Sequence, residues 1–171
     1  PKLDLLTLEG LELESVDMSF FKNNPNLKFL KLSNNKLMDL PVECFEKNKV
    51  VLTIDLSNNL FSRIPFMTFK HVSKTLMGLN MSGNPLTTWS GIYYLEFVNL
   101  ERLDLSHCGL ESVPIYLLSG CKYLHILNLS FNKLTRLPSL GNNLRIREID
   151  MSHNKIRSLD KVIFNTPHKY Y

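Results

Sequence analysis

The sequence predicts a right-handed α/β solenoid with a parallel concave β-sheet and an irregular or helical convex side. Three observations predict this fold class: a five-position apolar pattern, its recurrence about every 24 residues, and a polar residue at one fixed point of most copies. Such periodicity indicates stacked repeats, because each unit buries its apolar face only against its neighbours. We expect residues 1–171 to form a single array, with repeats that start near residues 3, 27, 51, 76, 100, 124 and 146.

The repeat pattern is L-x-x-L-x-L-x-x-N-x-L, and the copy formed by Leu27, Leu30, Leu32, Asn35 and Leu37 shows it in full. Side chains alternate along a strand, so Leu30 and Leu32 are expected to point into the core while the residues between them face outward. Asn35 follows the strand at a turn. An amide offers both donors and an acceptor, so this residue is expected to hydrogen-bond the backbone of its own coil and of the adjacent one.

These residues resemble the leucine-rich repeat family over nearly the whole chain. The strand sequence Leu-Asp-Leu-Ser at residues 103–106 is similar to the typical 24-residue class of animal receptor ectodomains, such as Toll-like and Slit-like arrays. An aromatic residue eighteen positions after several repeat starts is similar too. These aromatics are Phe21, Phe45, Phe69, Tyr94 and Phe164. The resemblance implies an innate-immune type of receptor that recognises proteins, and the family tolerates a cysteine such as Cys108 in place of the repeat asparagine.

Composition is that of a soluble array, with 44% hydrophobic and 21% charged residues. An apolar run of about 18 residues is absent, so membrane attachment is expected only through segments outside this sequence. The first copy is irregular and neither end has a cysteine-rich cap, so we expect a piece of a longer ectodomain that lacks its terminal caps. The three cysteines do not make a disulfide framework, and the net charge of +4 permits acidic partners without requiring them.

The sequence predicts no enzyme, cofactor, metal site or small-molecule substrate. Cys108 should face inward and His107 outward, so they cannot pair as nucleophile and base. Asp55, Asp104 and Asp150 recur in one outward column at about 10 Å, near the carboxylate spacing of inverting glycosidases. An open strand face, however, does not raise the pKa of one carboxyl as that chemistry requires. The histidines and cysteines also lack the spacing of zinc ligands.

The partner-binding surface is predicted on the concave face of the last four repeats. Its centre is Phe131, an outward aromatic in the same column as two histidines on adjacent repeats, which is typical of an interface hot spot. The partner would be a protein ligand or a co-receptor. The predicted contact residues are Arg102, Asp104, His107, Phe131, Asp150 and His153.

Two features bear on where the protein acts. The triplets that begin at Asn80 and Asn128 are candidate N-glycosylation sites, and they agree with an extracellular or cell-surface glycoprotein involved in signalling. The alternative is a cytosolic leucine-rich repeat scaffold or adaptor, because unpaired cysteines suit a reducing compartment.

A second alternative is binding of a polyanion, either a glycosaminoglycan or a nucleic acid, by a basic C-terminal flank. No aromatic platform for stacking bases is evident in that flank, which weakens the nucleic-acid version. The basic residues are Lys133, Arg136, Arg145, Arg147, Lys155, Arg157, Lys161 and Lys169.

Overall fold

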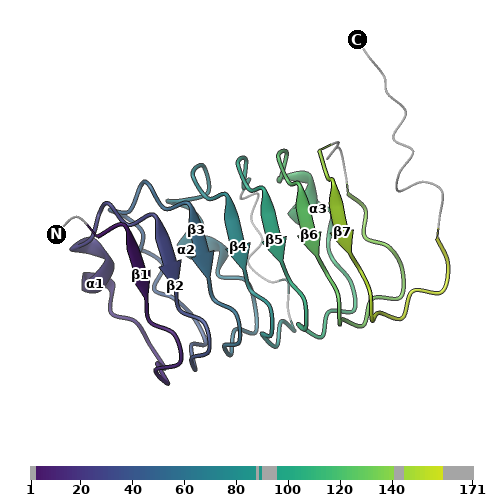
Figure 1. Ribbon diagram of the computed structural model, residues 1–171, viewed down its shortest axis with the longest axis horizontal. Coiled ribbons are helices and arrows are strands. Elements are labelled where there is room, and N and C mark those ends of the chain that lie inside the picture. The colour runs from purple at the N-terminus through teal and green to yellow at the C-terminus, as the bar shows by residue number, and fades with distance from the viewer. Residues whose placement is uncertain (1–2, 88, 90–95, 141–144, 160–171) are drawn as a thin grey trace, which may run out of the picture.

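The computed structural model describes residues 3–87, 89, 96–140 and 145–159. Within these residues, seven short strands form one parallel sheet in sequence order (Figure 1). The strands are β1 (Leu5–Thr7), β2 (Phe29–Lys31), β3 (Thr53–Asp55), β4 (Gly78–Asn80), β5 (Arg102–Asp104), β6 (Ile126–Asn128) and β7 (Glu148–Asp150). The solenoid fold class predicted from the repeat is confirmed.

The central residue of each strand is more buried than the two beside it, and in β2–β6 it is buried outright. Leu30 is fully buried, whereas Phe29 and Lys31 on either side of it are exposed, as the predicted alternation requires. The register pairs Leu30 with Leu6 on one side and with Ile54 on the other, so inward residues of successive coils stack directly. This stacking makes one continuous core, since a single three-residue strand has too little apolar surface to bury by itself.

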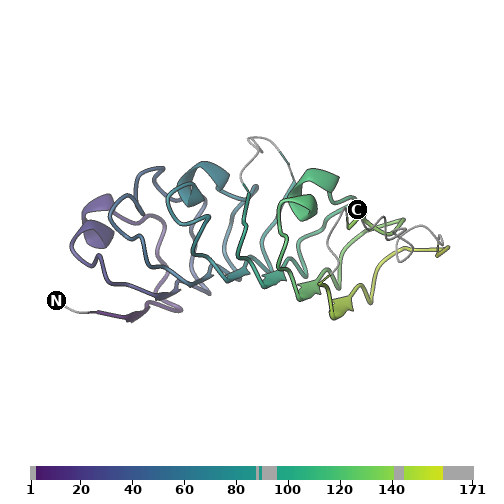
Figure 2. The same ribbon diagram turned by 90° about the horizontal axis from the view of Figure 1, so that it is seen from above.

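The helices lie on the side of the coil opposite the sheet, and Figure 2 shows the strands along the inner side of a shallow arc. They are α1 (Met18–Lys22), α2 (Phe66–Phe69) and α3 (Ile115–Ser119). Asp17 caps α1 by accepting a hydrogen bond from the Ser19 backbone N–H at 2.7 Å. In the part of the chain that the structure describes, no helix is long and apolar enough to cross a membrane.

Phenylalanine rings fill the core beneath the convex side. The ring centroids of Phe21 and Phe45 are 5.4 Å apart, and those of Phe45 and Phe69 are 6.3 Å apart, as the predicted aromatic position requires. Phe97 continues the row at 6.2 Å from Phe69, although the spacing rule selected Tyr94 for this repeat. Tyr94 and Phe164 lie outside the described residues.

The repeat asparagines join neighbouring coils through the backbone. The Asn59 amide donates to the Leu32 carbonyl of the preceding coil at 2.9 Å and to the Leu56 carbonyl of its own coil at 3.1 Å. Its Oδ1 accepts from the Leu37 N–H at 3.0 Å. This is the two-sided bonding that the sequence predicted. These bonds fix the turn after each strand, and therefore fix the direction of the side chains beside that turn.

Candidate functional site

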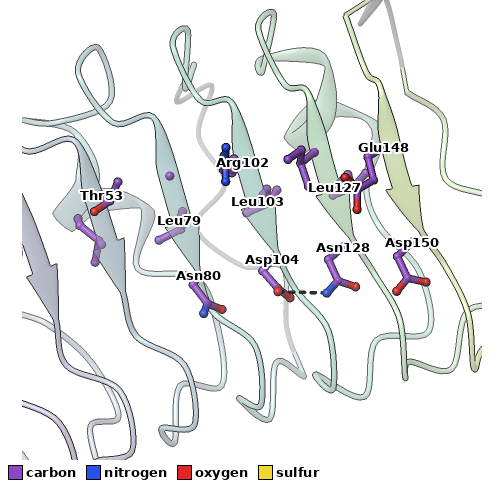
Figure 3. A pocket seen from close by; sticks show the side chains of 13 residues that line it. Thr53, Leu79, Asn80, Arg102, Leu103, Asp104, Leu127, Asn128, Glu148 and Asp150 are labelled. Carbon is purple, nitrogen blue, oxygen red and sulfur yellow. Dashed lines mark hydrogen bonds between the residues drawn. The ribbon is translucent and has the colours of Figure 1, made fainter.

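A hollow of about 360 Å³ lies on the concave face over β3–β7 (Figure 3). It opens where Gly78 contributes no side chain between Thr53 and Arg102, which occupy the same strand position on either side. A Cβ at residue 78 would lie 3.2 Å from Thr53 Cγ2, so even alanine would crowd this wall. The absence of a side chain on β4 therefore shapes the hollow.

One rim of the hollow is a column in which carboxylates and amides alternate. The strand register places these side chains on successive strands: Asp55, Asn80, Asp104, Asn128 and Asp150. The Asn128 amide donates to Asp104 Oδ2 at 3.1 Å (Figure 3). Each Oδ1 accepts from the backbone N–H of the serine two residues later, at 2.9–3.0 Å. The column is thus held rigidly by its own backbone.

Three of the six predicted contact residues line this hollow. Arg102, Asp104 and Asp150 all project from strands into it (Figure 3). Glu148 occupies the same strand position as Arg102, two strands farther along the sheet. The hydrogen bond from the Ser152 backbone N–H lowers the pKa of the Asp150 carboxyl. The carboxylate therefore stays ionised well into the acid range. The hollow also includes Ile126, which the sequence analysis did not select although it shares the strand position of Arg102.

The other three predicted contact residues do not project from the strands. His107, Phe131 and His153 lie in the turns directly after β5, β6 and β7. The expected placement on the strand face is wrong because the backbone turns left-handed at each position, with φ of 56°, 54° and 54°, and this breaks the strand alternation. The six residues therefore form two groups along one side of the sheet, the hollow and this second set.

The second set is a stack of three rings, which we call the edge stack (His107, Phe131 and His153). The centroids of the His107 and Phe131 rings are 4.2 Å apart with an interplanar angle of 11°. Those of Phe131 and His153 are 4.0 Å apart at 14°. Phe131 nevertheless remains 46% exposed. Both faces of its ring are covered by imidazoles, so the exposed part of the Phe131 ring is its edge.

The same position in earlier repeats is filled by residues suited to a left-handed turn. Asn34, Asn58 and Gly83 have φ of 57°, 53° and 69°. Glycine enters this region readily, and asparagine and histidine are enriched in it, whereas a phenylalanine is strained there by roughly 1–2 kcal/mol. The phenylalanine at residue 131 is thus unfavourable for the backbone. Strain of this kind is concentrated at functional sites in proteins.

Charge is distributed unevenly along the array. Every ion pair among the described residues lies between residues 4 and 71, for example Arg63 with Asp39 at 2.8 Å and Lys36 with Glu12 at 3.5 Å. Arg145 lies over the Tyr123 ring, 4.3 Å from its centroid. Within the predicted basic flank, the exposed residues that form no ion pair with a described side chain are Lys133, Arg136, Arg147, Lys155 and Arg157. Lys161 and Lys169 lie outside the described residues.

The edge stack runs beside this basic flank. Lys133 and Lys155 follow Phe131 and His153 by two residues, after the repeat asparagine. The sequence analysis expected no aromatic platform for stacking bases in this flank. The structure places the edge stack close to the flank, but both faces of its central Phe131 ring are covered by imidazoles.

Both candidate glycosylation residues lie in the hollow, Asn80 on β4 and Asn128 on β6. Each is partly buried, and the Ser130 hydroxyl donates to Asn128 Oδ1 at 2.7 Å. A glycan on either residue would therefore start on the concave face.

The described residues contain no group of three or more side chains that could hold a metal ion. The thiols of Cys44, Cys108 and Cys121 are buried, and burial raises their pKa to about 12, 11 and 12. A protonated, buried thiol is a poor nucleophile. Cys108 Sγ faces the Met81 carbonyl at 3.3 Å rather than any imidazole.

Comparison with known proteins identifies a family and a related protein. A family model described as leucine rich repeat matches residues 1–61 and 98–156. Tsukushi from Mus musculus is 35% identical over 89 residues, which are 50% of this chain and 25% of Tsukushi. The chain thus spans about a quarter of that relative.

Two solved structures share the fold. The TLR13–ssRNA13 complex aligns with a TM-score of 0.83 at 24% identity and covers 95% of this chain, which corresponds to 23% of that chain. The Drosophila Toll–Spatzle complex aligns with a TM-score of 0.79 at 24% identity, over 93% of this chain and 22% of the other. At this level of identity the likeness concerns the fold alone.

Proposed function

The chain belongs to the leucine-rich repeat family, and on that premise we propose that it is a non-catalytic protein-recognition module, part of the ligand-binding ectodomain of a cell-surface or secreted receptor-like protein. The observation that carries this proposal is the adjacency of the hollow and the edge stack, which follow one another on the same repeats. The proposed contact residues are Arg102, Asp104, His107, Phe131, Asp150 and His153.

Rigidity supports a binding role for these side chains. The backbone beneath Phe131 is bonded to both neighbouring coils, because the Ser130 carbonyl accepts from the His107 N–H of the preceding coil at 3.0 Å and the Phe131 N–H donates to the Ser152 carbonyl of the next coil at 3.0 Å. A partner therefore loses little free energy to ordering this surface. An exposed ring held in place between other rings has the character of an interface anchor.

The arrangement of the polar groups favours binding over catalysis. In the hollow, the Ser152 N–H donates to the Asp150 carboxylate and lowers its pKa, so this group is not prepared to act as a general acid near neutral pH. The imidazoles of the edge stack are turned toward a phenyl ring rather than toward a nucleophile. These contacts are those of a recognition surface.

An extracellular location fits the buried state of the thiols. Unpaired cysteines suggested a cytosolic scaffold as the alternative, but a thiol with a pKa of about 12 and no access to solvent is protected from oxidation. The same cysteines are therefore compatible with an oxidising compartment. The proposal includes N-glycosylation at Asn80 and Asn128 and a protein ligand or co-receptor as the partner.

The test is a binding screen of the chain against an array of secreted and cell-surface proteins. Each ligand found is retested against Arg102→Ala/Asp104→Asn and against Phe131→Asn. A specific ligand that binds the parent and loses affinity with either variant supports the proposal. Ligands unaffected by both variants would place recognition elsewhere. Specific ligands found only in a matched array of cytosolic proteins would favour the scaffold instead.

A further inference from the structure

The edge stack has a definite electrostatic character. An aromatic ring is negative on its faces and positive around its edge. Both faces of Phe131 are covered, at centroid distances of 4.2 and 4.0 Å, so a partner meets ring edges rather than faces. The edges of the two exposed imidazoles add N–H groups that can donate hydrogen bonds. The stripe is therefore apolar at its centre and attracts hydrogen-bond acceptors.

Two lysines that form no ion pair with a described residue lie next to this stripe. Lys36, Lys133 and Lys155 occupy the same repeat position, immediately after the repeat asparagine. Lys36 is paired with Glu12 at 3.5 Å, whereas Lys133 and Lys155 form no ion pair with a described residue. A single exposed lysine is common on protein surfaces and indicates no partner. Two lysines beside an exposed apolar ring, however, are complementary to an acidic surface that also carries an apolar group.

We propose that the edge stack together with Lys133 and Lys155 docks an acidic protein segment that carries an apolar side chain. The inference rests on the proposed function and gives the chemistry of the partner. Carboxylates of the segment pair with the lysines and approach the ring edges, while its apolar side chain covers the exposed part of Phe131. The left-handed backbone at the three rings, which is unfavourable for Phe131, holds these edges outward for that contact.

A nucleic acid fits the same surface less well. Single-stranded nucleic acids gain most of their sequence-independent contact energy, apart from charge, from bases stacked on aromatic faces. The faces of Phe131 are already occupied by His107 and His153. Binding of RNA or of a sulfated glycan would then depend on the lysines and the outer imidazoles and would not require the phenyl ring. This difference separates the two classes of partner experimentally.

The experiment measures fluorescence anisotropy of labelled synthetic peptides with repeating Glu-Glu-Leu, Glu-Glu-Ser or Lys-Lys-Leu sequence, added to the parent chain. Two test variants are used, Phe131→Asn and Lys133→Gln/Lys155→Gln. Asparagine suits the left-handed turn, as Asn34 and Asn58 show, so the first variant is expected to fold. The matched controls are Phe29→Ser, which removes another exposed ring, and Lys36→Gln, which changes the same repeat position in a paired lysine.

The parent should bind the Glu-Glu-Leu peptide more tightly than the other two. Phe131→Asn should weaken that binding roughly tenfold or more, as expected for a hot-spot ring, and the double lysine variant several-fold with a smaller salt dependence. The controls should bind like the parent. If Phe131→Asn, with an unchanged circular dichroism spectrum, still binds as the parent does, the proposal is wrong. A variant that does not fold is replaced by Phe131→Gly, and the same comparison decides.

A second arm uses a single-stranded RNA oligonucleotide and a heparin fragment. Tighter binding of either than of the acidic peptide, lost in the lysine variant and kept in Phe131→Asn, would overturn the proposal in favour of a polyanion. Failure of the peptides while the protein array yields a ligand sensitive to Arg102→Ala/Asp104→Asn would reject this inference alone. Peptide binding without any protein ligand would instead count against the proposed function.

Discussion

Replacing Cys108 with asparagine should stabilise the array. Cys108 is at the position that asparagine occupies in the repeats on either side, and its single thiol hydrogen is shared between the Met81 and Ser106 carbonyls, each at 3.3 Å. Asn132 in the next repeat donates to the Leu105 carbonyl at 2.8 Å and also accepts hydrogen bonds through Oδ1. The cysteine therefore leaves this coil with fewer bonds to its neighbour than the other coils have.

The gain can be worked out from these contacts. An amide at residue 108 would replace a weak thiol bond with two stronger donors and would add an acceptor within reach of the preceding turn. In that turn the Leu86 N–H now bonds to the Asn84 carbonyl at 2.8 Å. A net hydrogen bond is worth about 0.5–1.5 kcal/mol, and burying a further polar group offsets part of two such bonds. We expect a net stabilisation of about 1 kcal/mol, or roughly 2–4 °C in Tm.

Urea unfolding followed by circular dichroism measures this difference, with thermal melts as a second probe. Cys108→Ala is the control that removes the thiol and adds no partner, and it should be less stable than the parent. Asn132→Cys is the reverse change and should cost roughly 2–3 kcal/mol, because the Cys108 and Leu110 N–H groups would lose their acceptor. A Cys108→Asn variant no more stable than Cys108→Ala would refute this hydrogen-bond account.

Four further outcomes are expected. Leu129→Ala should lower the free energy of unfolding by about 2–5 kcal/mol in a urea titration, since this side chain is fully buried. Lys70 lowers the pKa of the Glu43 carboxyl below its ordinary 4.5, so the stability advantage of the parent over Glu43→Gln should be present above that pH and shrink as acid titrates the carboxylate. A thiol reagent should label none of the three cysteines until urea unfolds the chain. Secreted from eukaryotic cells, the chain should show glycans at Asn80 and Asn128 by mass spectrometry after enzymatic deglycosylation in heavy-oxygen water.

The inward residues and the asparagine column could be predicted because both follow from the repeat period. A side chain such as Leu30 is buried in every coil of this kind, and Asn59 makes the bonds that its position requires. The aromatic of the fourth repeat could not be placed in this way. Phe97 fills the core where the count from the repeat start selects Tyr94, because the convex segment has no sheet register to fix its length.

The place of the edge-stack rings was mispredicted for a different reason. The rings were assigned to the strands, although the strands end at Asp104, Asn128 and Asp150, three residues before each ring. The next residues belong to a turn in which period two no longer applies. A signal was nevertheless present in the sequence, since Asn34 and Asn58 occupy the same column and asparagine is common in left-handed turns.

In a solenoid, residues at equivalent positions of adjacent repeats are stronger evidence for a binding surface than any one of them alone. One exposed phenylalanine on a soluble protein indicates little. In a parallel array, however, equivalent positions of adjacent repeats lie about 4.8 Å apart, close to the contact distance of stacked rings. Aromatic side chains at this position in three successive repeats, where earlier repeats have asparagine or glycine, therefore form one continuous surface. This change alters no inward residue. For this reason the stack of Phe131 between two histidines, with a phenylalanine that departs from what the backbone favours, is better evidence for a binding site than the leucines that define the fold.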